Sequence, residues 1–308
     1  MIRYARAPSP AFLALLAPGG FLSTLLTRRE VAGVALDVQF REHDHLHVYC
    51  GLTRLVNASL TGGRLRVTAH KTYSVQPCAA DLFRVWPIDE SGFAAAVERY
   101  FAGVQVNPTH VLSEGAVQAA WAAVRHPWTP FDREAVLGYV NTAAQTAGRA
   151  FPRVVAARAE LERLRTAGRW APMPKGKVGA ELDQLAVDPE GRLVLLELKD
   201  AAASPSSVYY SPLQLLQYVL EWAVAFDVVR DQLRALIEAR KAVGLSPVDM
   251  PDLGRGLRPV VGFGADLRSA EVRARFDEVR DVVNRHLPAG AAPMEAWAME
   301  RSTPVRIG

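Results

Sequence analysis

Four charged residues near the middle of the chain have the types and spacing that chemistry requires. They are Glu181, Asp183, Glu197 and Lys199. The first two open an apolar run over residues 182–188, and the last two close a second run over residues 192–200. Both runs are rich in Val and Leu and are bounded by turn residues, a pattern that is typical of β-strands. We therefore expect a pair of strands with charged residues at its open end.

The connection between the two runs, Pro189-Glu190-Gly191, predicts a hairpin loop with a bulge, because its final glycine can adopt a positive φ angle. Pairing Asp188 with Arg192 across this loop defines the register of the two strands. In that register Asp183 lies opposite Glu197, and Glu181 lies opposite Lys199. Because side chains alternate along a strand, all four emerge on one face of the hairpin.

Three carboxylates and one ammonium group on one face favour a bound cation, since like charges directly opposite each other destabilise a sheet. Carboxylate, carbonyl and water oxygens are the ligands that Mg²⁺ and Mn²⁺ prefer. A lysine beside such an ion can position a water molecule or stabilise the charge that develops on a phosphate. The pattern thus predicts a phosphodiesterase site. The alternative is a hairpin end with solvated charges, in which Lys199 pairs with Glu181 or Glu197.

The spacing of these residues resembles a known signature. Asp183, followed by Glu197-Leu198-Lys199 at the end of the next strand, is similar to the D…(D/E)xK motif of the PD-(D/E)XK nuclease superfamily. Gln214 and Tyr218, in the next predicted helix, resemble the QxxxY motif of its RecB-like branch. The chain departs from the pattern at Leu182, where the motif has proline. The resemblance covers roughly residues 150–300 and implies an α/β fold, with a mixed sheet flanked by helices.

The resemblance also implies the roles of the site residues. Asp183 and Glu197 would hold Mg²⁺ or Mn²⁺, the main-chain carbonyl of Leu198 would be a further ligand, and Lys199 would orient the attacking water or stabilise the transition state. The implied substrate is DNA. The alternative is a module without catalysis that binds nucleic acid or protein on a nuclease-like fold. The residues expected in the site are Asp183, Glu197, Leu198, Lys199, Gln214 and Tyr218, with Glu181 as an auxiliary.

Further candidate nucleic-acid contacts flank the hairpin. Lys175 and Lys177 lie among glycines just before it and suit contact with a phosphate backbone, although a solvated loop has the same composition. After the hairpin, Tyr209 and Tyr210 either stack on unpaired bases or pack against the start of the next helix.

Two other groups of candidate metal ligands are weaker. His43, His45 and His47 would share one face of a strand and suit zinc or copper, but a polar entrance to the strand is the favoured interpretation. Glu160 or Glu162, in the helix before the hairpin, would supply a further acidic ligand in the superfamily. Glutamates among arginines more often form a solvated helix face, which is favoured here.

Composition places the chain among ordinary globular proteins. It has 308 residues, of which 50% are hydrophobic and 22% charged, and a net charge of +4, which permits a polyanionic partner without requiring one. Cys50 and Cys78 are too few for a disulfide framework, which predicts a cytoplasmic protein. No apolar stretch reaches the roughly twenty residues of a membrane-spanning helix. We expect nucleic acid as the partner rather than a membrane, and a homodimer is left open.

The order of predicted elements suggests two domains. Residues 1–125 form a small α+β domain that binds substrate or a partner, with an antiparallel meander over residues 31–72 and a helix over 91–103. Residues 126–308 form the nuclease-like α/β domain. Its predicted elements are helices at 129–148 and 152–166, the hairpin, helices from residue 211 and over about 228–243, a strand at 259–263, a helix at 269–286 and a strand at 295–299.

Overall fold

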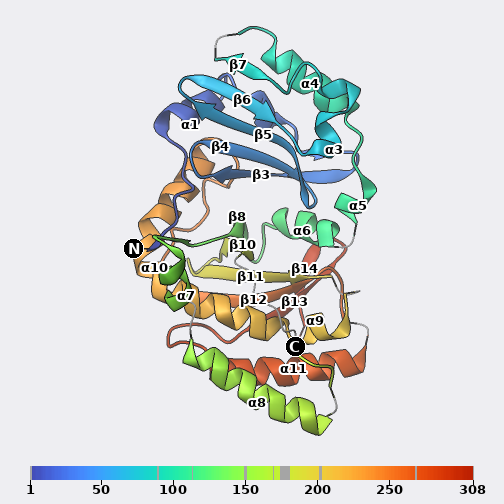
Figure 1. Ribbon diagram of the computed structural model, residues 1–308, viewed down its shortest axis with the longest axis vertical. Coiled ribbons are helices and arrows are strands. Elements are labelled where there is room, and N and C mark those ends of the chain that lie inside the picture. Colours follow the sequence, from blue (N-terminus) through green and yellow to red (C-terminus); the bar gives the residue numbers. More distant parts are fainter. Residues whose placement is uncertain are drawn as a thin grey trace. The chain divides into compact units, whose positions relative to one another are not determined.

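The computed structural model describes residues 2–307, except residues 89, 113, 149–150, 169, 174–180, 201–202 and 268 (Figure 1). The chain divides into two compact units. Unit 1 comprises Met1–Tyr4, Val124–Arg230 and Pro251–Gly308, and unit 2 comprises Ala5–Ala123 and Asp231–Met250. The sequence predicts a single division at residues 125/126. The structure divides the chain near that point, but it also assigns the first four residues to unit 1 and a helical segment to unit 2.

Unit 1 is built on a six-stranded mixed sheet. Neighbouring strands are antiparallel except for two adjacent parallel pairs, β11 with β12 and β12 with β13. This mixture of directions, with helices that follow the strands, is the α/β class that the sequence predicts. The strands in sheet order are β14 (Thr303–Arg306), β13 (Glu295–Glu300), β12 (Leu257–Phe263), β11 (Leu193–Lys199), β10 (Leu182–Val187) and β8 (Thr129–Ala135).

The hairpin of β10 and β11 has the predicted register. Gln184 lies opposite Leu196, and the pairing continues to Val187 opposite Leu193. The loop glycine, Gly191, adopts a φ of 76°, and a β-carbon there would lie 2.5 Å from the carbonyl oxygen of Asp252. Both the backbone conformation and the close approach therefore require glycine at the turn.

Among the helices of unit 1, α8, α9, α11 and the first part of α10 lie on one side of the sheet (Figure 1). The strands carry apolar residues on both sides, which predicts helices on both faces of the sheet, but these four helices all lie on one face. Two helices predicted between Ser211 and residue 243 form one continuous helix. None of the helices in the described part of the chain is long and apolar enough to cross a bilayer. The helices are α7 (Thr142–Gly148), α8 (Pro152–Gly168), α9 (Pro205–Tyr209), α10 (Ser211–Ala242) and α11 (Ala270–Arg285).

The helix predicted over residues 129–148 is wrong. Thr129–Ala135 is strand β8, and α7 begins only at Thr142. The Thr129-Pro130 pair resembles a helix start, but β8 lies at the edge of the sheet, where a proline without an N–H donor is tolerated. A second short strand, β9 (Gly138–Tyr139), pairs with β1 (Ile2–Arg3). The first residues of the chain thereby join unit 1.

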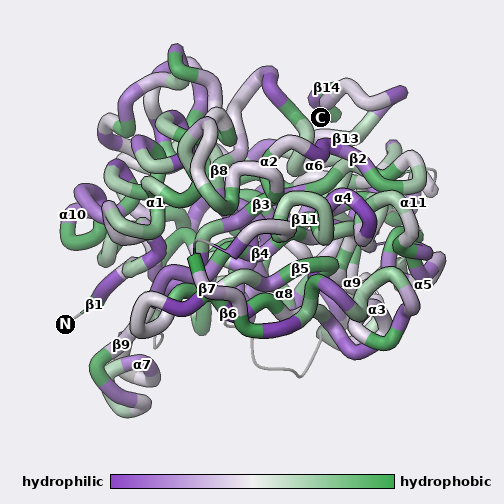
Figure 2. The backbone as a smooth tube through the Cα atoms, turned by 90° about the horizontal axis from the view of Figure 1, so that it is seen from above, coloured by the Kyte–Doolittle hydropathy of each residue, from purple (hydrophilic) through white to green (hydrophobic). Residues whose placement is uncertain are grey.

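Unit 2 contains a six-stranded antiparallel sheet with its strands in chain order. The predicted meander is confirmed, and the chain turns between β4 and β5 at Gly51, whose φ is 59°. Hydrophilic and hydrophobic residues alternate along β5 and β6 (Figure 2). The strands are β2 (Glu30–Val31), β3 (Val34–Arg41), β4 (His45–Cys50), β5 (Thr53–Thr61), β6 (Arg64–Thr68) and β7 (Val85–Pro87). The helices are α1 (Pro10–Leu16), α2 (Thr24–Thr27), α3 (Lys71–Ser74), η1 (Pro77–Ala79), α4 (Phe93–Gly103), α5 (Pro108–Val111) and α6 (Glu114–Ala122).

Candidate active site

Asp183 is held against the neighbouring strand by a main-chain contact. One more step of the hairpin register places it opposite Glu197, with both side chains on one face. Its Oδ2 atom accepts a 2.7 Å hydrogen bond from the main-chain N–H of Leu198. The N–H and C=O groups of a strand residue point to the same side, so the carbonyl of Leu198 also faces β10. The hairpin thus gathers two carboxylates and a carbonyl oxygen at its open end.

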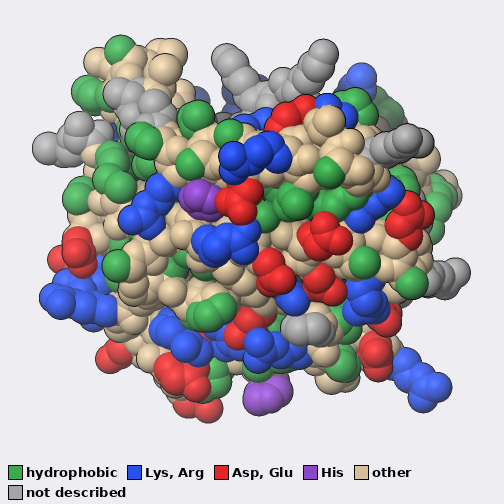
Figure 3. All heavy atoms as spheres, turned by 90° about the horizontal axis from the view of Figure 1, so that it is seen from below, with side chains coloured by type: hydrophobic (Ala, Val, Ile, Leu, Met, Phe, Trp, Pro, Cys, Tyr) green, Lys and Arg blue, Asp and Glu red, His purple; other side chains and the backbone are tan. Residues whose placement is uncertain are grey.

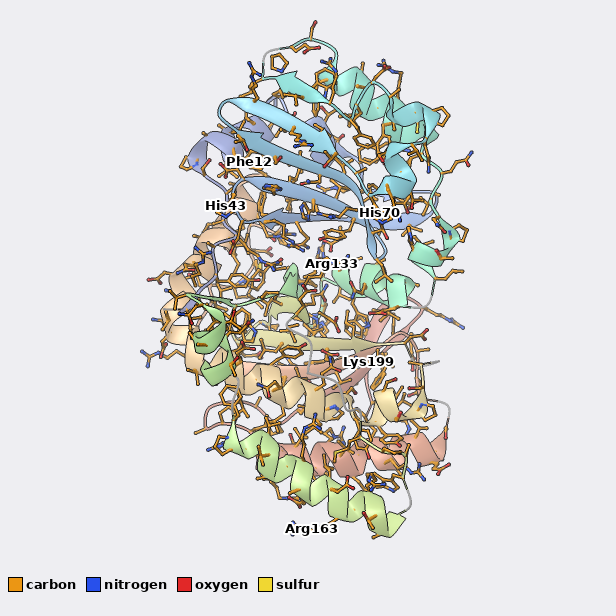
Figure 4. All side chains as sticks on the ribbon, in the orientation of Figure 1. Phe12, His43, His70, Arg133, Arg163 and Lys199 are labelled. Carbon is orange, nitrogen blue, oxygen red and sulfur yellow. The ribbon has the colours of Figure 1, made fainter. Side chains whose placement is uncertain are left out.

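Glu197 and Lys199 form a largely buried ion pair at the end of β11. The Lys199 Nζ atom lies 2.6 Å from Glu197 Oε1. The Lys199 side chain is 19% exposed and the Glu197 side chain 1%. Figure 4 labels Lys199 in the sheet of unit 1. A buried carboxylate is costly without a partner, so the ammonium group compensates a charge that the fold places inside the protein.

Helix α10 is attached to the start of β10 through Tyr218. Its buried hydroxyl donates a 2.8 Å hydrogen bond to the main-chain carbonyl of Glu181. The side chain of Glu181 itself is exposed, and the contact with Tyr218 uses only its main chain. Gln214 lies one turn before Tyr218 and is half-buried, and its side chain forms no hydrogen bond with another residue that the structure describes. The structure therefore brings Tyr218 to the hairpin, but it gives Gln214 no such contact.

Two buried carboxylates near this region do not appear among the predicted site residues. Glu221, one turn after Tyr218, is 3% exposed and accepts a 2.6 Å hydrogen bond from the Tyr139 hydroxyl. Asp132 on β8 is 1% exposed and accepts a hydrogen bond from the Tyr4 hydroxyl. An acidic residue inside the otherwise apolar run of α10 is a signal for Glu221. Asp132 could not be recognised from the sequence, because residues 129–148 are predicted to form a helix and not strand β8.

The flanking nucleic-acid contacts are only partly described. Lys175 and Lys177 lie outside the described residues. Tyr209 and Tyr210 are buried, with 0% and 3% of their surface exposed, so they pack inside unit 1 and do not present their rings to bases. The Tyr210 hydroxyl donates to the carbonyl of Ala171 at 3.1 Å, and burial raises the pKa of Tyr210 to about 12.

The acidic residues of α8 belong to a mixed charged surface. Glu160 pairs with Arg285 and His286 of α11, and the hydrogen bond from Arg285 is the main cause of its lowered pKa. Glu162 pairs with Arg165 one turn later on the same helix. Figure 3 shows acidic and basic side chains interspersed on this side of the protein. These contacts support the solvated helix face and not a metal ligand.

The three histidines of unit 2 do not converge on one point. His43 lies in the turn before β4, with a φ of 61° and a side chain that is 81% exposed. His45 Nδ1 is 3.2 Å from Asn57 Oδ1, and His47 Nδ1 is 3.2 Å from the Tyr49 hydroxyl. The strand therefore carries hydrogen-bonded imidazoles, in agreement with the favoured polar interpretation.

Within the described residues, no group of three or more His, Cys, Asp and Glu side chains is arranged to hold a metal ion. Magnesium does not need such a group, since it commonly uses one or two carboxylates together with waters and substrate phosphates. Asp183, Glu197 and the carbonyl of Leu198 provide oxygen ligands of that kind on adjacent strands. The residues present at the hairpin therefore fit Mg²⁺ or Mn²⁺.

Comparison with known proteins identifies no relative of this chain. No family model, no curated protein and no solved structure matches the chain. What the protein does must therefore be inferred from the side chains of the β10–β11 hairpin and from their surroundings.

Proposed function

We propose that this protein is a metal-dependent nuclease that hydrolyses phosphodiester bonds, with the β10–β11 hairpin as its active site. The observation that carries the proposal is the arrangement of Asp183 opposite Glu197 on one face, with the Lys199 ammonium group 2.6 Å from Glu197. This combination corresponds to the D…ExK pattern of the PD-(D/E)XK superfamily. A mixed sheet in which neither strand of that hairpin is an edge strand supports the same assignment.

The roles of the chain's own residues follow from their positions. Asp183 and Glu197 would hold the ion, with the Leu198 carbonyl as a further ligand. The ion, when bound, supplies Lewis-acid stabilisation of the phosphate and activates water. Lys199 would then pair with Glu197 in the free protein and with the phosphate during the reaction. Its ammonium group compensates Glu197 in the free protein and would stabilise the charge that develops on the phosphate oxygens.

Tyr218 has a positioning role in this proposal. Its hydroxyl fixes the main chain at Glu181, two residues before Asp183, and so defines where β10 enters the site. Gln214 would contact the substrate or the ion's water ligands from the preceding turn of α10, because residues four apart share a face of a helix. We propose DNA as the substrate, from the resemblance to the superfamily.

A non-catalytic function is the second candidate. The ion pair between Glu197 and Lys199 favours it, because each charge is already compensated within the chain. In that case the nuclease-like unit would serve to bind nucleic acid or protein, and Lys199 would be needed only for stability.

Cleavage of labelled DNA with and without divalent ions separates the two candidates. We expect the parent protein to cut plasmid or single-stranded DNA in Mg²⁺ or Mn²⁺, and to be inactive in EDTA. The Asp183→Asn variant should be inactive with either divalent ion and in EDTA. The matched control is Asp227→Asn, which changes an exposed carboxylate on α10 and should cut at the parental rate. Purified parent protein that leaves DNA and RNA intact in either metal would exclude the nuclease.

A further inference from the structure

One face of the unit 2 sheet is polar across four strands. Along β3, β4, β5 and β6 the apolar residues alternate with polar ones and are mostly buried, as in Val38, Leu46 and Ala58. The residues between them pair across the strands and share the opposite face. We call this set the polar sheet face. Its members Gln39, His47, Tyr49 and Ser59 are buried, and Arg54, Thr61, Arg64 and Arg66, on β5 and β6, are exposed. The remaining members are Asp37, Arg41, His45, Asn57 and Thr68.

The charge of the polar sheet face is predominantly positive. It carries four arginines and a single carboxylate, that of Asp37. Arg54, Arg64 and Arg66 are exposed, and no acidic side chain in the described part of the chain forms an ion pair with any of the three. Their guanidinium groups are therefore available to an anion from outside the unit.

His47 and Tyr49, which are linked by a hydrogen bond, lie between Arg41 and Arg54. Arg54 Nη1 is 3.4 Å from His47 Nε2, and the other ring nitrogen of His47 is 3.2 Å from the Tyr49 hydroxyl. Arg41 Nη2 reaches the same hydroxyl at 3.4 Å. Burial, followed by the charges of Arg41 and Arg54, lowers the pKa of His47 to about 3. His47 is therefore uncharged at neutral pH, and it links Arg54 to Tyr49 without adding a third positive charge.

We propose that the exposed arginines of the polar sheet face, Arg54, Arg64 and Arg66, bind the phosphate backbone of a nucleic-acid strand. The identity of this polyanion rests on the proposed nuclease function, whereas the preference for an anion rests on the charge of the face. In this proposal unit 2 contributes affinity for the substrate, and unit 1 performs the chemistry.

The exposed groups define the kind of binding. Arg54, Arg64 and Arg66 are phosphate ligands, whereas Tyr49 is only 4% exposed and has little ring surface for a base. Contacts to phosphate carry affinity but no sequence information. Binding at this face should therefore depend strongly on salt and only weakly on nucleotide sequence.

The test measures binding of a fluorescein-labelled oligonucleotide to the full chain as salt is varied. The buffer contains EDTA, so cleavage does not contribute. We expect Arg54→Ala/Arg64→Ala/Arg66→Ala to lower affinity at least tenfold at about 0.1 M salt. The slope of log K against log salt should fall by about two to three, because three phosphate contacts are lost. Arg99→Ala, which removes an exposed arginine of α4 in the same unit, is the matched control and should bind like the parent.

The outcomes are separable from those of the proposed function. Parental affinity and salt slope in the triple variant, at an unchanged melting temperature, would overturn the inference, as would a parent that binds no oligonucleotide. Equal binding of a poly-glutamate peptide would show that the occupant is an acidic protein segment and would also overturn it. Loss of binding only in the triple variant supports the inference even if the parent protein cleaves nothing, a result that would reject the nuclease alone.

Discussion

At the scale of single residues, the charges of the candidate site are balanced within the chain. The sequence suggests that the opposed carboxylates repel each other until a cation binds. In the structure Asp183 is hydrogen-bonded to the main chain of Leu198, and Glu197 is paired with Lys199. The free protein therefore already has partial compensation for the charges that a metal ion would neutralise.

The stability of the free protein should depend more on Lys199 than on Glu197. Lys199→Ala leaves a carboxylate that is 1% exposed without its cation, and we expect the free energy of unfolding to fall by about 3–5 kcal/mol. Glu197→Gln should cost less, because the partly exposed ammonium group of Lys199 can be hydrated. Urea denaturation in EDTA measures both values.

Lys241→Ala is a control for the loss of a lysine ion pair. Lys241 pairs with the exposed Glu238 at 3.0 Å, so its removal should cost less than about 1 kcal/mol. Added Mg²⁺ should restore part of the stability of Lys199→Ala through binding to the native state. Equal losses in the Lys199 and Lys241 variants would show that burial of Glu197 does not matter.

Residues close in sequence could be predicted, and residues joined by the tertiary fold could not. Asp183, Glu197 and Lys199 belong to one hairpin whose register depends on a short loop, so local rules place them together. Glu221 and its partner Tyr139 are 82 residues apart, and no local pattern connects them. The buried acid–hydroxyl contacts are therefore a finding of the structure.

At the scale of elements, the hairpin and most helices follow from local patterns, whereas β8 does not. Helix α11 lies where the sequence predicts a helix, and the Ser269 side chain caps it by accepting from the N–H of Val272. For β8 the Thr-Pro pair predicts a helix start, but pairing with β10 across the sheet determines the outcome. Sequence patterns near residue 130 contain no information on that partner, which lies some fifty residues later in the chain.

The attachment of α10 to β10 can be tested with two conservative tyrosine variants. Tyr218→Phe removes the hydroxyl that donates to the carbonyl of Glu181, and it should lower the free energy of unfolding by about 1 kcal/mol. The Tyr209 hydroxyl is buried without a hydrogen-bond partner among the described residues. Tyr209→Phe should therefore leave stability unchanged or increase it, because a desolvated hydroxyl is removed. Chemical denaturation gives both differences.

The same pair of variants distinguishes position from stability. If Tyr218 positions the site, Tyr218→Phe should also lower the rate of DNA cleavage at a temperature where the protein is fully folded. Tyr209→Phe should cleave like the parent. A Tyr218→Phe protein with parental stability and parental cleavage would remove the proposed role of this hydroxyl.

At the scale of the whole molecule, the chain forms two units, but each unit includes a segment from outside its main stretch of sequence. The composition of the meander predicts a separate N-terminal module. It does not predict that Met1–Tyr4 belong to unit 1, where the buried Tyr4 ring packs on Trp222, or that Asp231–Met250 belong to unit 2. These exchanges depend on long-range packing of apolar surface, which sequence periodicity does not report.

The stability of unit 2 should depend on pH through His47. Its pKa of about 3 in the folded protein lies below the ordinary value of 6.5, so the unfolded chain binds more protons between these values. Stability contributed by His47 is therefore fully present above about pH 6.5 and is lost progressively as the pH falls toward 3. We expect the melting temperature to decrease over this window, and His47→Gln should reduce the slope.

His43→Gln is the control for this titration. The His43 side chain is 81% exposed, so its replacement should leave the pH dependence of the melting temperature as in the parent. If His47→Gln and His43→Gln gave the same pH profile as the parent, the acid sensitivity of the protein would have another origin.

The most direct test of the proposed site is Glu197→Gln, measured by melting temperature in Mn²⁺ and by DNA cleavage. The substitution preserves the side-chain volume and removes the negative charge, so the fold should persist. The parent should gain melting temperature as Mn²⁺ is added and should cleave DNA, because the ion binds only the native state. Glu197→Gln should gain less and should not cleave. A Glu197→Gln protein with the parental response to Mn²⁺ and the parental cleavage rate would contradict the assignment of the β10–β11 hairpin as the active site.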